Sequence, residues 1–269
     1  MRQALFPISL LLSSTACSSQ AEYARDAGVA PTGAAPRPAA TPVVFESDEA
    51  RDGGEREFGY KWPGAVSAQP ALARQLTEER DRILAQEKVE WTDALADAPV
   101  DCTGCRQRSF AKEWKVVADL PGYLSLSGEF STYTGGAHGM YGLESLVWDK
   151  AGQRAVPGVG LFRSPEALEA ALGPKLCAAL NAEREKRRGE PVGPAGGPDD
   201  IGFDSCQHVK DATVLVGSST GRAFDRIGVW FGPYVEGSYA EGAYELNFPV
   251  DAAVLKAVKP EFAGAFAAR

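Results

Sequence analysis

Histidine and cysteine, the residue types best suited to catalysis or metal binding, are scarce in this chain, which has two histidines and five cysteines. His138 ends the run Tyr133-Thr134-Gly135-Gly136-Ala137-His138, in which an apparent strand leads into two glycines. Glycines tolerate positive φ and allow close approach of the backbone. His138 could act as a general base if a carboxylate lay beside it. Alternatively, the glycines form a bend in which His138 bonds a backbone group.

A second segment, Trp230–Gly242, is interrupted by glycines and carries Tyr234 and Tyr239. Tyrosine offers a large contact area with a polar tip at a low entropic cost, as binding surfaces require. We interpret the two segments together as a candidate contact surface; the alternative is that the tyrosines fold back onto a sheet. A role in binding a partner is favoured if the two segments lie on one exposed face. If they lie on opposite faces, the binding hypothesis rests on similarity of fold alone.

Four cysteines can form disulfides or bind a metal: Cys102, Cys105, Cys177 and Cys206. In an exported protein an even number indicates two disulfides, and of the three pairings we favour Cys102–Cys105 and Cys177–Cys206. Cys102, Cys105, Cys206 and His208 also have the types of zinc ligands, but a zinc site would leave Cys177 unpaired. A redox-active pair would need a thioredoxin-like βαβ pattern, which is not found around Cys102. We therefore expect no metal and no cofactor.

The fifth cysteine, Cys17, ends a segment typical of a bacterial lipoprotein signal. Arg2 supplies a minimal positive charge, and the apolar run Ala4–Leu12 is far shorter than the ~20 residues that cross a membrane. Small residues precede the cysteine, although Ser14 stands where such motifs usually carry Leu, so the alternative is an ordinary signal peptide. We expect residues 1–17 to be a lipoprotein signal peptide whose acylated cysteine anchors the exported chain in a lipid membrane.

Charge and composition narrow the organisation further. Ser18, not Asp, follows the cysteine, which by similarity to Gram-negative lipoproteins predicts the periplasmic face of the outer membrane. Residues 18–55 are rich in Ala, Pro, Gly and charge, and they bury too little apolar area to offset the entropy of ordering them, so we expect a tether. Residues 56–269 can form one domain or two small associated ones. The net charge of −8 argues against nucleic acid and permits a basic partner.

Hydrophobic periodicity divides the rest of the chain into helices and strands. Helices are predicted at 70–91, 165–180 and 254–266, and strands at 114–120, 123–130, 143–148, 213–216, 226–231 and 244–250. The charged run Glu183–Arg188 is interpreted as a solvated helix end. Turn residues separate consecutive strands and the helices come in blocks, so we predict an α+β fold with helices on a mostly antiparallel sheet.

Sequence motifs give catalysis little support. Gly217-Ser218-Ser219-Thr220-Gly221 matches a nucleophile elbow, but another strand follows it and both histidines precede it, so a hairpin turn is the better interpretation. Polysaccharide hydrolysis needs two carboxylates across a cleft, and no motif selects a pair among 36 acidic residues. We expect no catalytic residues.

Together these segments resemble the RsiV-like family of exported domains. The family includes the extracellular domain of the lysozyme-sensing anti-sigma factor RsiV and the non-catalytic domain of the deacetylase PdaC, and it is largely one of unknown function. The matching pieces are Tyr133–His138, Trp148-Asp149 with Gly152, Val159–Phe162, and Gly232–Gly242 followed by Phe248-Pro249. They span about Trp114 to Pro260, which is most of the predicted domain.

The resemblance implies an α+β fold in two associated subdomains and, in one member, binding of lysozyme by loops that enter the cleft of the enzyme. The chain contains neither a zinc-binding anti-sigma segment nor the metal histidines of a deacetylase. Our leading hypothesis is a non-enzymatic binding module at the cell envelope for lysozyme or a cell-wall glycan. The residues expected to bind are Tyr133, Thr134, Gly135, Gly136, His138, Tyr234 and Tyr239. The alternatives are a hydrolase of envelope polymers with His138 as general base, and a structural lipoprotein.

Overall fold

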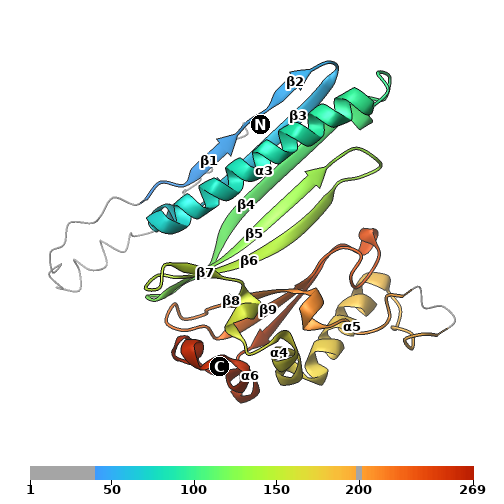
Figure 1. The fold of residues 1–269 in the computed structure, drawn as a ribbon. Coiled ribbons are helices and arrows are strands. Elements are labelled where there is room, and N and C mark those ends of the chain that lie inside the picture. The colour runs from blue at the N-terminus through green and yellow to red at the C-terminus, as the bar shows by residue number, and fades with distance from the viewer. Residues whose placement is uncertain (1–39, 198–201) are drawn as a thin grey trace, which may run out of the picture. The chain divides into compact units, whose positions relative to one another are not determined.

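The computed structural model describes residues 40–197 and 202–269, which belong to one compact unit, Ala40–Arg269 (Figure 1). The predicted signal peptide, Cys17 and residues 18–39 of the predicted tether lie outside the described residues. Over the described part of the chain, no helix combines the length and the apolar character needed to cross a membrane.

A seven-stranded sheet forms the first half of the unit, in the order β1-β3-β4-β5-β6-β7 with β2 also paired to β3. The strands are β1 Val43–Glu46, β2 Glu49–Arg51, β3 Gly54–Trp62, β4 Gln107–Asp119, β5 Tyr123–Tyr133, β6 Met140–Asp149 and β7 Arg154–Val156. All pairs are antiparallel except β3–β4, which is parallel because a helix connects these two strands. The mostly antiparallel α+β fold is confirmed.

The prediction of a tether over residues 18–55 is wrong for residues 43–55, because β1, β2 and the start of β3 lie there. The physical reason is strand pairing: Val43–Glu46 is too short to be stable alone, but it pairs along Trp62–Gly59 of β3. Pairing with a long, half-buried strand supplies the backbone hydrogen bonds that the composition of the segment does not reveal.

The long helix α3, Pro70–Asp97, covers one face of this sheet and follows the short helix α2, Gly64–Ser67 (Figure 1). Successive side chains of a strand point to opposite faces, so the buried aromatic residues of β3 all face this helix. These residues form one hydrophobic cluster with α3: Phe58, Tyr60, Trp62, Leu72, Leu76, Phe110, Trp114, Leu124 and Leu126. The opposite face of the sheet is free of α3 and carries the polar side chains of the same strands.

A three-stranded antiparallel sheet, ordered β10-β9-β8, forms the second half. Its strands are β8 Thr213–Gly217, β9 Arg226–Phe231 and β10 Tyr244–Pro249, and its helices are α4 Pro165–Leu172, α5 Pro174–Arg188 and α6 Ala252–Ala257. Short 3-10 helices lie at Gly104–Arg106, Gly158–Leu161, Val209–Asp211, Tyr239–Glu241 and Pro260–Ala265. Leucines of α4 and α5 pack on one face of the sheet in a second hydrophobic cluster.

Two predicted helices are divided in the structure. The helix expected over residues 165–180 ends at Leu172 and restarts at Pro174, because Gly173 adopts a φ of +56°. The helix expected over residues 254–266 is α6 followed by a 3-10 helix that starts at Pro260, since proline lacks the N–H that would continue the helical bonds.

The two sheets meet along β8. The hydroxyl of Thr213 donates a 2.8 Å hydrogen bond to the carbonyl of Leu143 in β6. A Cβ at Gly158 would lie 2.0 Å from the carbonyl oxygen of Val214, so only glycine allows the chain to pass this close to β8. Two hydrophobic clusters thus lie within one compact unit.

Candidate binding surface

The turn between β5 and β6, residues 134–139, is shaped by the two glycines that the sequence singled out. Gly135 and Gly136 adopt φ angles of +92° and +98°, which L side chains rarely reach. The hydroxyl of Tyr133 donates a 3.0 Å hydrogen bond to the carbonyl of Gly136. A Cβ at Gly135 would lie 3.3 Å from the carbonyl oxygen of Gly104, so this turn packs against the Cys102–Cys105 turn.

The connection between β9 and β10, residues 232–243, is called the tyrosine loop below. Ser238 and Glu241 form a reciprocal capping box at the start of a 3-10 turn, which fixes the backbone beside Tyr239. Tyr234 has a φ of +67°, an uncommon conformation for a residue with a side chain, and its side chain is 50% exposed. The loop therefore presents one exposed tyrosine and one that is partly buried.

These two segments, about 100 residues apart in sequence, meet on one face. The imidazole of His138 stacks on the ring of Tyr239 with centroids 4.0 Å apart and planes inclined by 19°. The Tyr239 hydroxyl donates a 2.8 Å hydrogen bond to the carbonyl of Gly139, and Tyr234 lies 5.6 Å from Tyr239 between ring centroids. Of the two arrangements considered from sequence, the structure has the convergent one.

The hydrogen bonds of His138 define its tautomer. Nδ1 lies 2.9 Å from the carbonyl oxygen of Gly139, and since that oxygen can only accept, Nδ1 carries the proton. Nε2 is then an acceptor, and it accepts a 3.4 Å hydrogen bond from the hydroxyl of Tyr234. Within the described residues, no carboxylate forms a hydrogen bond with His138.

Tyr141 of β6 extends this surface and was missed from the sequence. Its hydroxyl accepts a 3.0 Å hydrogen bond from the backbone N–H of Ala243, and its ring packs edge-on against Tyr239 with centroids 6.1 Å apart. Tyr141 lies two residues before the strand predicted at 143–148, so its place in β6 was not available from the sequence. We call His138, Tyr141, Tyr234 and Tyr239 the aromatic surface.

The charged run at the end of α5 exposes Glu185, Lys186 and Arg187, as predicted, but it buries Arg184, which holds the tyrosine loop. Arg184 is completely buried, and its Nη2 lies 2.5 Å from Oε2 of Glu236, which is also completely buried. Arg184 donates further bonds to the carbonyl oxygens of Glu236 at 3.1 Å and Ser205 at 2.9 Å. The prediction is wrong here because the partners of the arginine lie 21 and 52 residues away in sequence.

Two more arginines of the same run clamp the far side of the loop. Arg187 donates hydrogen bonds to the carbonyl oxygens of Glu241 at 2.7 Å and Ala243 at 2.8 Å. Arg188 donates to the Glu241 carboxylate at 2.9 Å. Although burial alone would raise the pKa of Glu241, hydrogen bonds from Tyr244 and Arg188 hold that pKa below its usual value. Glu241 thus stays ionised and keeps the loop attached to α5.

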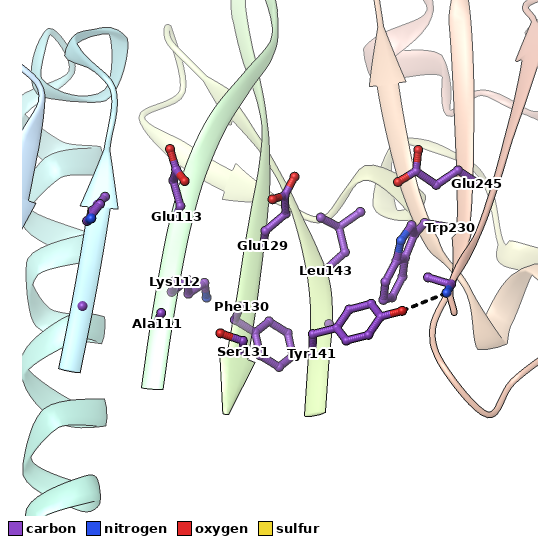
Figure 2. A pocket seen from close by; sticks show the side chains of 14 residues that line it. Ala111, Lys112, Glu113, Glu129, Phe130, Ser131, Tyr141, Leu143, Trp230 and Glu245 are labelled. Carbon is purple, nitrogen blue, oxygen red and sulfur yellow. Dashed lines mark hydrogen bonds between the residues drawn. The ribbon is translucent and has the colours of Figure 1, made fainter. Parts of the chain in front are cut away.

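An open groove of about 630 Å³ adjoins the aromatic surface (Figure 2). Its floor is the face of the large sheet that points away from α3, and its wall is formed by β9 and β10. The lining includes Lys61, Glu113, Glu129, Tyr141, Leu143, Trp230, Ala243 and Glu245. Apart from Trp230, which begins the second segment singled out above, these residues carried no signal in the sequence, since they come from six strands and the tyrosine loop.

The four cysteines pair as predicted. Disulfides join Cys102 to Cys105 and Cys177 to Cys206. The alternative zinc set is not formed, because Cys206 is bonded to Cys177, and Nδ1 of His208 lies 2.9 Å from a carboxylate oxygen of Glu169.

The serine-containing motif at residues 217–221 connects two antiparallel strands, β8 and β9, as the hairpin interpretation predicted. Asp225 accepts a 2.8 Å hydrogen bond from the backbone N–H of Ser219 and a second, short one from its hydroxyl. The motif is therefore a turn closed by an aspartate and not a strand-to-helix elbow.

Comparison with known proteins gives a similarity of structure. No family model and no curated protein matches the chain. Among solved structures, a DUF3298 family protein from Pseudomonas aeruginosa PAO1 has 18% sequence identity and a TM-score of 0.47, over 85% of this chain and 97% of that one. A member of the DUF3298 family from Bacteroides fragilis NCTC 9343 has 13% identity and a TM-score of 0.44, over 83% and 96%. Similarity at this level says nothing about function.

Proposed function

We propose that this domain is a non-enzymatic binding module of the cell envelope and that the aromatic surface contacts its partner. The stacking of His138 on Tyr239 carries the proposal, because it joins two distant segments into one surface. Tyrosines at a binding surface contribute large contact areas at a low entropic cost. Both ring nitrogens of His138 have hydrogen-bond partners, and among the described residues neither partner is a carboxylate. This arrangement favours binding over hydrolysis.

The way the surface is held also supports binding. Buried Arg184 and the clamps from Arg187 and Arg188 fix the tyrosine loop, and the glycine turn packs against a disulfide turn. A surface that is ordered before binding loses less entropy when the partner arrives. Two disulfides suit an oxidising compartment outside the cytoplasm.

A basic protein such as lysozyme is the first partner to test, with cell-wall glycan as the second. The net charge of −8 would steer a basic partner toward the domain, raising the association rate more than the affinity. The experiment is a calorimetric titration with lysozyme at low salt and with intact disulfides, followed by co-sedimentation with peptidoglycan.

We expect Tyr234→Ala to raise Kd at least tenfold for whichever partner binds. The matched control is Val89→Ala, which removes an exposed side chain from α3. Absence of lysozyme binding at low salt removes lysozyme as the partner. If neither lysozyme nor peptidoglycan binds, or if both substitutions act alike, the proposed role of the aromatic surface is wrong.

Acylation of Cys17 would hold this module at the periplasmic face of a membrane, a proposal that rests on the sequence alone. Its test is the distribution of the protein between membrane and released fractions in the producing cell. We expect Cys17→Ala to move the protein out of the membrane fraction. An unchanged distribution would contradict lipid anchoring and leave the binding role of the domain untouched.

A further inference from the structure

The groove beside the aromatic surface arises because each sheet turns a polar face toward it. In β9 and β10 the alternate residues Val229, Phe231 and Leu246 point to the helices and are buried. Trp230 and Glu245 therefore point the other way, and they are direct neighbours in the register of the two strands. A Cβ at Gly232 would lie 3.2 Å from the indole of Trp230, so this glycine packs against the ring.

The large sheet contributes two carboxylates to the same space. Glu113 and Glu129 are directly opposite each other in the β4–β5 register, where like charges destabilise a sheet. The Lys115 ammonium lies 2.6 Å from the Glu129 carboxylate and offsets part of this repulsion in an exposed position. Figure 2 shows Glu129 and Glu245 on opposite sides of the groove, with the indole of Trp230 below Glu245.

The lysines that line the groove do not neutralise these carboxylates. The ammonium of Lys112 is directed to the other face of the sheet, where it lies 2.6 Å from Glu79 and 2.7 Å from Glu144. The ammonium of Lys61 lies 3.6 Å from Glu46 of β1. Glu113, Glu129 and Glu245 thus share an open groove of about 630 Å³ with one indole, and of the three only Glu129 has an ion-pair partner among the described residues, Lys115. The complementary ligand is a cation with a flat or apolar body.

We propose that this groove binds arginine and lysine side chains of a cationic polypeptide. The cationic group stacks on Trp230 and donates hydrogen bonds to Glu129 and Glu245. Cations are attracted to the face of an indole, and charge-assisted hydrogen bonds to carboxylates are about twice as strong as neutral ones. Arginine suits the site best because its planar guanidinium both stacks and bonds in a fork.

The position of the groove connects this inference to the proposed function, on which it rests. Tyr141 and Ala243 both line the groove. Tyr141 is part of the aromatic surface and Ala243 adjoins it, and the hydrogen bond between these two residues closes the groove at that end. A basic protein that contacts the tyrosines can therefore place an extended basic segment along the groove. The groove would then supply a second contact, filled by the basic side chains of the partner.

Intrinsic fluorescence tests the site directly. The chain has five tryptophans, and Trp62, Trp91, Trp114 and Trp148 are at most 5% exposed, so a ligand in the groove changes chiefly the emission of Trp230. The probes are acetylated and amidated tetra-arginine and tetra-lysine peptides at low salt, with chitotetraose as the neutral glycan. We expect saturable quenching by both peptides, with the lower Kd for tetra-arginine, and no response to chitotetraose.

Isosteric variants separate the groove from general charge attraction. The double variant Glu129→Gln/Glu245→Gln should raise the Kd of tetra-arginine at least tenfold. Trp230→Leu removes the fluorophore itself and verifies that the quenching comes from Trp230. Glu78→Gln/Glu261→Gln removes the same charge from two exposed positions outside the groove and should change Kd less than twofold. A circular dichroism melt of each variant verifies that it is folded.

Equal effects of the two double variants, or binding of chitotetraose in place of the peptides, overturn the cationic groove. If lysozyme or peptidoglycan binds through the aromatic surface while neither peptide quenches Trp230, the groove inference is wrong and the proposed function stands. If no macromolecular partner binds and the peptides do, the groove is a cation site and the proposed function is wrong.

Discussion

Arg184 of α5 and Glu236 of the tyrosine loop form an ion pair in which both side chains are completely buried, with 2.5 Å between Nη2 and Oε2. The second carboxylate oxygen of Glu236, Oε1, is buried and has no hydrogen-bond partner among the described residues. Burial therefore raises the pKa of Glu236 to about 7, even though the charge of Arg184 lowers it. The negative charge of Asp211 raises it further. The residue that anchors the loop can thus change its protonation near neutral pH.

The raised pKa predicts a loss of stability as pH rises. In the unfolded chain Glu236 has the ordinary pKa of 4.5, so between about pH 4.5 and pH 7 the unfolded state releases the proton first. The free energy of unfolding therefore falls across this window by an amount on the order of 2–3 kcal/mol, at ~1.36 kcal/mol per pKa unit. Urea unfolding of the wild type and of Glu236→Gln at pH 5 and pH 8 measures the effect.

We expect the free energy of unfolding of Glu236→Gln to vary less between these two pH values than that of the wild type, since an amide does not titrate. Glu261→Gln, an exposed control, should keep the wild-type dependence. Parallel pH profiles for the wild type and Glu236→Gln would show that Glu236 is ionised throughout and that its pair with Arg184 resists protonation.

Most of the secondary structure was predictable because its signals are local. Alternation of apolar residues located the strands from β4 to β10 except the short β7, and the leucine spacing located α4 and α5. β3 was missed although Phe58, Tyr60 and Trp62 alternate with polar residues, because charged residues dominate the segment before them. The disulfides were predictable since four cysteines outside the signal allow only three pairings.

The site was predictable only in part, because its remaining members depend on contacts between distant segments. The glycines before His138 and the tyrosines after Trp230 mark two loops, but nothing local says that His138 stacks on Tyr239. In the sequence, Arg184 is indistinguishable from the other charged residues of its run, because its ion-pair partner Glu236 is distant along the chain. Similarly, nothing in the sequence distinguishes Glu129 and Glu245 from the other acidic residues, of which the chain has 36 in all. Only the packing of the two sheets places both at one groove.

The two disulfides should differ in their effect on stability. Cys177 and Cys206 are 29 residues apart, whereas Cys102 and Cys105 are three apart. On the chain-entropy model, closing the longer loop stabilises the fold by about 3–4 kcal/mol and closing the shorter one by about 2 kcal/mol. Urea unfolding of Cys177→Ser/Cys206→Ser should show the larger loss relative to Cys102→Ser/Cys105→Ser. A larger loss for the shorter loop would indicate that the glycine turn depends on it.

Arg106 should not tolerate replacement by lysine. Its side chain is 5% exposed, and it donates to the carbonyl oxygens of Leu95 at 3.2 Å and Ala98 at 2.9 Å, which end α3, and to that of Asp52 at 2.6 Å. A lysine ammonium is a single point charge and cannot reach both the end of α3 and the carbonyl oxygen of Asp52, so buried carbonyl oxygens lose their hydrogen-bond partners. We expect Arg106→Lys to lower the free energy of unfolding by about 2–4 kcal/mol.

The control for this substitution is Arg163→Lys at an exposed position, which should change stability by less than about 0.5 kcal/mol. Chemical denaturation of both variants under the same conditions provides the comparison. Similar small losses for the two would mean that water replaces the guanidinium at the end of α3.

The contact between His138 and Tyr239 should keep both loops ordered. Tyr239→Ala removes the stack and the 2.8 Å hydrogen bond to the Gly139 carbonyl, whereas Tyr239→Phe removes only the hydrogen bond. An aromatic pair contributes about 0.5–1.5 kcal/mol beyond its buried area, and a hydrogen bond about as much. We expect losses of stability of about 1–3 kcal/mol for Tyr239→Ala and about 1 kcal/mol for Tyr239→Phe.

Amide hydrogen exchange followed by mass spectrometry reports where the order is lost. Tyr239→Ala should accelerate exchange in residues 134–140, in the other loop, as well as in the tyrosine loop itself. Tyr234→Ala leaves the stack of His138 on Tyr239 in place and removes only the long 3.4 Å hydrogen bond to His138, so it should accelerate exchange mainly near residue 234. If exchange in residues 134–140 is unchanged in Tyr239→Ala, the glycine turn is held by Tyr133 and the Cys102–Cys105 turn alone, and the two loops are ordered independently.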